Sequence, residues 1–150
     1  MSELDLRRWL VKAWGRRAGE APLMWCEPTR GSSMGAPDVY VVLTSPKFGA
    51  VLVPLELKVW RVGRTGEASR RLRPAQHRYH ALMARAGIPT LVLAALEEGH
   101  DTAYFELWQG RRLVAGEEVP DIRKPFSLVQ GRSALENALS KAAFGSARKA

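Results

Sequence analysis

The stretch VLVPLELKVW, residues 51–60, is apolar at nearly every position, which predicts a strand buried on at least one face. Two opposite charges interrupt it, Glu56 and Lys58, with one leucine between them. Residues two apart on a strand point to the same face, so these charges project together and Leu55 and Leu57 enter the opposite layer. Burying a carboxylate and an ammonium is costly unless something compensates, so this strand is the first candidate for a functional site.

The length and composition of the chain indicate one globular domain. Its 150 residues suffice for one domain with a real core, and 46% hydrophobic with 25% charged residues argues against disorder. No apolar run reaches the roughly 18 residues of a membrane span, and the acids of MSELDLRRWL precede any apolar stretch, unlike a secretory signal. Cys26 is the only cysteine, which excludes an internal disulfide and fits a cytoplasmic location.

The positive charge of the chain is concentrated in one segment. The formal net charge is +8, and residues 60–85 carry seven arginines against one glutamate, whereas residues 86–150 are balanced. The planar guanidinium of arginine suits phosphate oxygens, so a basic segment beside a charged strand favours an anionic polymer as the partner. A solvated basic loop is the alternative interpretation.

The rest of the sequence predicts alternating helices and strands. Apolar residues recur at helical spacing from Leu6 to Trp14 with Ser2 as the N-cap, and Pro74 suits the first turn of a second helix. That second helix is expected at residues 74–85, a last helix at 133–144, and further strands at 22–26, 39–43 and 90–96.

Two hairpins and a loop connect these elements. Residues 39–43 and 51–60 are expected to form an antiparallel hairpin. Residues 102–108 and 111–115 predict a second hairpin, turned by Gln109-Gly110. The segment GRTGEAS, residues 63–69, is expected to be a flexible loop.

A carboxylate pair is predicted where the first hairpin opens. If the strand before residue 51 begins at Asp38, the hairpin brings this carboxylate alongside Glu56, and a hard divalent cation such as Mg²⁺ resolves their repulsion. Lys58 would then lie beside metal-bound water, where it could orient or deprotonate the attacking water or stabilise a five-coordinate phosphate. The alternative is an exposed Glu-x-Lys charge pair on a solvated edge, with Asp38 as an ordinary turn residue.

Several motifs follow one another in a specific order. They are Gly35-Ala36-Pro37-Asp38, an apolar strand, Leu55-Glu56-Leu57-Lys58, and a helix that begins Arg73-Pro74-Ala75-Gln76. Together they resemble the PD-(D/E)XK nuclease superfamily, most closely its VRR-NUC and Holliday-junction-resolvase-like members. The resemblance implies an α/β fold with a restriction-endonuclease-like αβββαβ core, a mixed central sheet flanked by helices. It covers about residues 1–100, and the hairpin and helix that the sequence pattern predicts beyond it form an extra carboxy-terminal extension at about 101–150, so we expect a single nuclease domain over residues 1–150.

The same resemblance assigns roles to individual residues. Asp38 and Glu56 would be metal ligands, and the backbone carbonyl of Leu57 would be a further ligand. Lys58 would be the catalytic lysine. Gln76 matches the glutamine that faces the active site in the VRR-NUC group, and its alternative is a polar residue on the helix surface.

Auxiliary residues follow from the same comparison of motifs. An acid on the first helix is frequent in these nucleases, and Glu3 lies where it is expected, although it equally fits a first-turn acid favoured by the helix dipole. Glu20 and Glu27 are rival candidates. Arg30 and Ser32 precede the Pro-Asp motif as in the resolvase pattern, where such residues touch the phosphate backbone, or they belong to a plain connector. The arginines expected to contact phosphates are Arg61, Arg64, Arg70, Arg71, Arg73 and Arg78.

The functional prediction is an Mg²⁺-dependent endodeoxyribonuclease, in which Mn²⁺ can substitute, acting on branched or otherwise structured DNA. Junction-resolving members of the family act as homodimers, and compact chains of this kind often come from phages, so the resemblance implies a homodimer in a bacterial or phage-infected cell. The alternatives are a non-catalytic nucleic-acid-binding module of the same fold and a small partner-binding protein. His77 and His80, at i and i+3, lack a third ligand of matching type and are interpreted as helix surface or core.

Overall fold

The computed structural model describes residues 1–14, 24–25, 35–37, 39–125 and 132–145, and these form one six-stranded sheet. Each strand lies beside its neighbour in sequence, and all neighbouring pairs are antiparallel except β3 and β4, which are parallel. The strands are β1 (Met24–Trp25), β2 (Val39–Ser45), β3 (Gly49–Arg61), β4 (Leu91–Glu98), β5 (Asp101–Gln109) and β6 (Ile122–Pro125).

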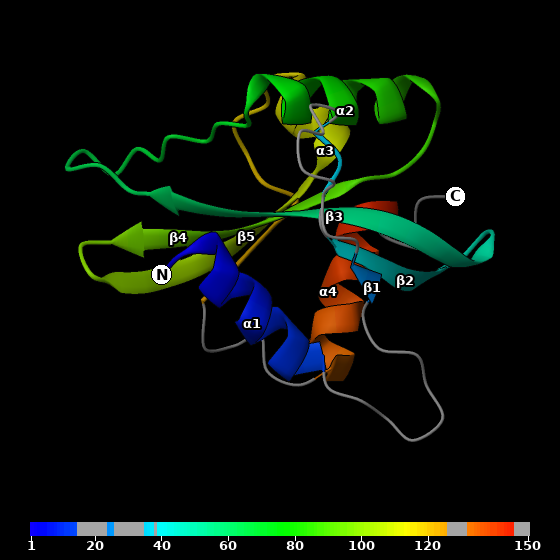
Figure 1. The fold of residues 1–150 in the computed structure, drawn as a ribbon, viewed down its shortest axis with the longest axis horizontal. Helices are drawn as coiled ribbons and strands as arrows, with labels where there is room; N and C mark the ends of the chain where they lie inside the picture. The colour runs from blue at the N-terminus through cyan, green and yellow to red at the C-terminus, as the bar shows by residue number, and fades with distance from the viewer. Residues whose placement is uncertain (15–23, 26–34, 38, 126–131, 146–150) are drawn as a thin grey trace.

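Within the described residues, four helices cover the two faces of this sheet. They are α1 (Glu3–Trp14), α2 (Pro74–Arg85), α3 (Gly110–Val114) and α4 (Arg132–Phe144). Figure 1 shows α1 and α4 on one side of the sheet and α2 and α3 on the other. The element order through β4 is αβββαβ, so the predicted α/β fold with a mixed sheet flanked by helices is confirmed. None of the helices in the described residues is long and apolar enough to cross a membrane.

The larger hydrophobic core lies between the sheet and the helices α1 and α4. Leu55 and Leu57 of β3 enter it from the sheet, Leu6 and Leu10 from α1, and Leu135 from α4. All five are buried, and fully burying a side chain of this kind contributes roughly 1.5–3 kcal/mol. α4 therefore shares one core with α1.

A smaller core lies on the opposite face, below α2 and α3. Its buried members are Trp60, Val92, Ala94, Leu96 and Trp108. Trp60 is two residues from Lys58 and four from Glu56, so the alternation along β3 turns both charges toward this face. The predicted separation of the charges from Leu55 and Leu57 is confirmed.

The start of α1 and both ends of α2 follow the sequence prediction. The backbone N–H of Asp5 donates to Oγ of Ser2 over 3.1 Å, and the Ser2 N–H donates back to the Asp5 carboxylate over 2.9 Å, which confirms Ser2 as the N-cap of α1. α2 begins at Pro74 and ends just before Gly87, which adopts a φ of 74° that favours glycine.

The second hairpin differs from the prediction. β4 and β5 turn at Gly99, and α3 replaces the strand expected at residues 111–115. A Cβ on Gly110 would lie 2.1 Å from Oγ1 of Thr90 and 2.5 Å from Nδ1 of His80. The glycine is needed for close packing at this point rather than for a hairpin turn, and β6 returns beside β5 instead.

Candidate active site

The charged part of β3 begins where its pairing with β2 ends. Within the described residues, β2 pairs with β3 as far as Val39 opposite Leu55, so the predicted first hairpin is confirmed. Beyond this point the ladder of β3 continues on its other side, with β4. Glu56 and Lys58 thus lie just past the last described β2 pair, where β3 pairs in parallel with β4.

Glu56 and Lys58 are buried although both are charged. They are 7% and 6% exposed, and their partners in register on β4, Val92 and Ala94, belong to the smaller core. The alternative of an exposed charge pair on a solvated edge is therefore wrong. Removing each charge from water costs several kcal/mol unless attraction and hydrogen bonds offset it. Leu57, whose carbonyl is a predicted ligand, sends its side chain into the opposite core.

The first helix brings a second carboxylate to Lys58. Oε1 of Glu3 lies 3.7 Å from Nζ of Lys58, and the Glu3 side chain is 44% exposed. Glu3 is the first residue of α1, so the capped start of the helix reaches the charged segment of β3. The two rival acids, Glu20 and Glu27, lie outside the described residues.

His80 on α2 faces the same region. It is fully buried, and its Nδ1 lies 2.7 Å from Oγ1 of Thr90. Burial, together with the nearby charges of His77 and Lys58, lowers the pKa of His80 from 6.5 to about 4, so the imidazole is neutral at pH 7. His77 is exposed, and the interpretation of the two histidines as helix surface and core is confirmed.

The pKa of Tyr79, the residue before His80, is affected by the carboxylate of Glu56. Burial raises the pKa of Tyr79, and Tyr40 of β2 and Glu56 raise it further. Tyr40 contributes both by its charge and by a hydrogen bond to the Tyr79 side chain. Tyr79 of α2 is therefore within electrostatic range of Glu56, and His80 of α2 is within electrostatic range of Lys58.

Gln76 is engaged at the start of α2. Its Oε1 accepts a hydrogen bond from the backbone N–H of Arg73 over 3.0 Å. The motif that contains Asp38 meets the same turn, because a Cβ on Gly35 would lie 2.1 Å from the carbonyl oxygen of Ala75. Gly35 also has a φ of 71°, which favours glycine. The described contact of Gln76 is thus a helix cap, beside the segment that leads to Asp38.

Three predicted site residues lie outside the described residues. These are Asp38, Arg30 and Ser32. The neighbours of Asp38 in the chain, Pro37 and Val39, are both buried. Val39 pairs with Leu55, which directly precedes Glu56. The role of Asp38 as a ligand stays a prediction.

The arginines expected to contact phosphates divide into two kinds. Those exposed to solvent are Arg61, Arg64, Arg71, Arg73 and Arg78. Arg70 differs, because its guanidinium donates two hydrogen bonds to the carboxylate of Glu106, over 2.7 and 2.6 Å. Sequence reasoning missed Glu106, which is fully buried. An acid inside the apolar run YFELW is the same signal that singled out Glu56, and it would have found this residue too.

The described residues hold only part of the predicted metal site. Among them, no group of three or more His, Cys, Asp or Glu side chains could hold a metal ion. They do include Glu56 and, against Lys58, Glu3. Carboxylate oxygens are the donors that Mg²⁺ prefers, so the chemistry of these two side chains fits the predicted ion.

Comparisons with known proteins add no support for the nuclease resemblance, which therefore depends on the sequence motifs alone. The structure contributes the burial of Glu56 and Lys58 on one face of β3, with Glu3 beside the lysine. It does not test the family itself, which stays a prediction. No protein-family model, curated protein or solved structure matches the chain.

Proposed function

We propose that the chain is a metal-dependent endodeoxyribonuclease that hydrolyses phosphodiesters in branched or structured DNA. The observation that carries the proposal is the burial of Glu56 and Lys58 on one face of β3, with Glu3 3.7 Å from the lysine. Apolar residues at these positions would hold the sheet together at least as well. A chain that keeps two buried charges there uses them for something other than stability, and catalysis is the use that fits their chemistry.

Hydrolysis of a phosphodiester requires charge stabilisation at phosphorus. The oxygen of a water molecule forms a new P–O bond, and one ester P–O bond breaks. The water gives up a proton, and the departing oxygen takes one up. The ammonium of Lys58 would stabilise the extra negative charge on the phosphate as the bond forms. Glu56, Glu3 and the predicted ligand Asp38 would hold Mg²⁺, or Mn²⁺ in its place, which would supply further positive charge to the same phosphate.

The exposed arginines support DNA as the substrate. Arg61 ends β3, three residues beyond Lys58, and it is 79% exposed. Guanidinium groups on phosphates fix the position of a duplex and carry little sequence information, so a surface of this kind fits selection by DNA shape. Symmetric cleavage of a junction needs two active sites, and we therefore include a homodimer in the proposal.

A panel of labelled junction, flap, single-stranded and duplex DNA, each with Mg²⁺, Mn²⁺ or EDTA, tests the proposal. Cleavage should require the metal, and Glu56→Gln should abolish it while DNA binding persists. Glu98→Gln removes the same charge at an exposed position and should leave cleavage unchanged. Binding without cleavage under every metal condition would instead favour a non-catalytic module, and absent or salt-insensitive binding would favour a protein that binds other partners.

A further inference from the structure

The segment between β3 and α2 forms a basic arm, residues 62–73, that is tied to the sheet. In Figure 1 it projects from the sheet as an extended loop and turns back to α2. Its base is held by the Val62 N–H, which donates to the Glu97 carbonyl over 2.8 Å. Nearer α2, the indole N–H of Trp60 donates to the carbonyl of Arg71 over 3.2 Å. The flexible loop predicted at residues 63–69 is thus anchored on both sides.

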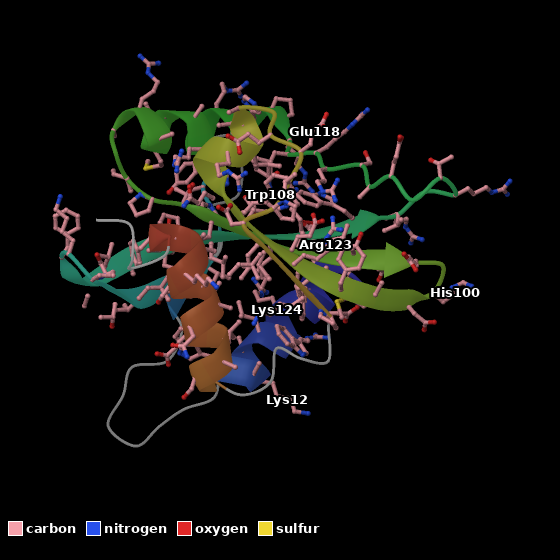
Figure 2. The ribbon with its side chains drawn as sticks, turned by 180° about the vertical axis from the view of Figure 1, so that it is seen from behind. Lys12, His100, Trp108, Glu118, Arg123 and Lys124 are labelled. Atoms are coloured by element: carbon pink, nitrogen blue, oxygen red, sulfur yellow. The ribbon has the colours of Figure 1, made fainter. Side chains whose placement is uncertain are left out.

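The strongest anchor of the arm is the carboxylate of Glu106 on β5. Besides the two hydrogen bonds from Arg70, this carboxylate accepts one from Trp108 over 3.1 Å and one from Arg123 of β6 over 2.9 Å. Figure 2 labels Trp108 and Arg123, which belong to the neighbouring strands β5 and β6. The Arg70 guanidinium carbon also lies 5.7 Å from the centroid of the Trp108 ring, within cation–π range.

Glu106 remains a carboxylate despite its burial. Burial alone would raise the pKa of Glu106, but the hydrogen bonds from Arg70, Trp108 and Arg123 lower it below its ordinary value. A buried and ionised carboxylate attracts a guanidinium much more strongly than an exposed one, because little water screens the pair. Glu106 therefore restrains the arm at a residue 36 positions away in sequence.

The arm divides its arginines between two tasks. Arg70 has 21% of its side chain exposed and points inward to Glu106. Arg64, Arg71 and Arg73 are exposed on the same arm. Fixing Arg70 fixes the backbone on which its neighbour Arg71 stands. A surface held in place before binding loses less conformational freedom when it meets a ligand.

We propose that Glu106 is a positioning residue for DNA binding: it holds Arg70 and so presents Arg64, Arg71 and Arg73 as a preformed surface for the phosphate backbone. This inference rests on the proposed function, and it assigns to Arg70 an internal role in place of the predicted phosphate contact. The direction in which Glu106→Gln changes the affinity for DNA separates the two roles. Removing the negative charge of Glu106 favours DNA binding electrostatically, whereas loosening the arm opposes it.

The test uses Glu106→Gln and Arg70→Gln in the full chain. In both variants trypsin should cut after Arg64 and Arg71 several-fold faster than in the unmutated protein, without DNA present. The Kd for duplex DNA should rise about tenfold through lost preorganisation. The KM for cleavage should rise with it, while kcat at saturating DNA stays unchanged. Arg70→Gln leaves Arg123 and Trp108 on the carboxylate, so this variant keeps the buried acid satisfied and folded.

Two controls accompany these variants. Glu98→Gln removes an exposed negative charge and should leave the trypsin pattern unchanged, with Kd equal or slightly lower. Arg123→Gln removes a donor to Glu106 that lies outside the arm, so the arm should stay protected.

Three results would overturn the inference: tighter DNA binding by Glu106→Gln, an arm that stays protected in both variants, or a loosened arm with unchanged Kd. If the unmutated protein binds no DNA, the proposed function fails, and the trypsin result still reports whether Glu106 holds the arm.

Discussion

The double variant Glu56→Gln/Lys58→Met should lose cleavage and yet fold at least as stably as the unmutated chain. Both substitutions preserve the approximate shape of the side chain, and together they leave the net charge at +8. If Glu56 and Lys58 are retained for the fold, their removal should lower the free energy of unfolding. If they are retained for catalysis, it should not. The variant therefore separates a structural from a catalytic role in one experiment.

The expected size of the effect follows from burial and distance. Lys58 is 6% exposed, and its contact with Glu3 at 3.7 Å is worth at most about 4 kcal/mol of attraction at an effective dielectric constant of about 20, and less because Glu3 is 44% exposed and screened by water. Desolvation of a buried ion offsets this by several kcal/mol. Replacing buried ionic groups by well-packed hydrophobic residues of similar volume is often neutral or stabilising by about 1–4 kcal/mol, and the polar amide of glutamine puts this variant near the lower end. A gain of about 1 kcal/mol corresponds to a Tm rise of about 2–4 °C in a chain of this size.

Urea unfolding, DNA cleavage and DNA binding are measured on the same preparations. The matched control is Glu98→Gln/Lys124→Met, which makes the same changes at exposed positions and should stay within about 0.5 kcal/mol of the unmutated chain, with full cleavage. A loss of more than about 1 kcal/mol in the buried double variant would show that Glu56 and Lys58 hold the sheet together. Residual cleavage would refute their catalytic role.

Two further predictions concern the packing of α2 and α3. The free energy of unfolding should fall by about 3 kcal/mol between pH 6.5 and 4 through His80 alone, because its folded pKa of about 4 lets the unfolded chain take up the proton first. Comparing His80→Gln with the unmutated chain in urea at several pH values should show that slope disappear. Gly110→Ala should destabilise the fold by about 2–4 kcal/mol in the same assay, because the new Cβ would displace Thr90 and His80 and break their hydrogen bond.

Each of these predictions has a neighbouring control. His77→Gln, at an exposed histidine, should keep the pH slope of the unmutated chain, and an equal loss in both variants would contradict the assignment to His80. Gly116→Ala should cost only about 1 kcal/mol, because its φ of 80° is strained for alanine but no atom lies within 4 Å of the new Cβ. A Gly110→Ala effect no larger than that would contradict the packing argument.

Local signals in the sequence were sufficient for most of the first hundred residues. The periodicity from Leu6 to Trp14 predicted α1, and Pro74 with Gly87 gave both ends of α2, because caps and turns depend on adjacent residues. The charges inside β3 marked Glu56 and Lys58, because an apolar strand rarely carries such residues.

The errors came from contacts between distant parts of the chain. Gly110 suggested a turn, but its true neighbours are Thr90 and His80, which no local pattern reveals. The anchoring of the basic arm on Glu106 was also missed, because Arg70 and Glu106 lie 36 residues apart in sequence. Glu3 was a candidate for the site only through the family resemblance, and nothing local in either segment predicts its approach to Lys58.

The shared core of α1 and α4 has a consequence for the order of assembly. More than a hundred residues separate these two helices in sequence, yet Leu135 and Leu139 pack in the same core as Leu6 and Leu10. α1 also packs on β3, but during synthesis the part of its apolar side that contacts α4 stays exposed until α4 has left the ribosome. Contacts between residues so distant in sequence slow folding. A nascent chain stalled after residue 100 would expose apolar surface to which chaperones bind.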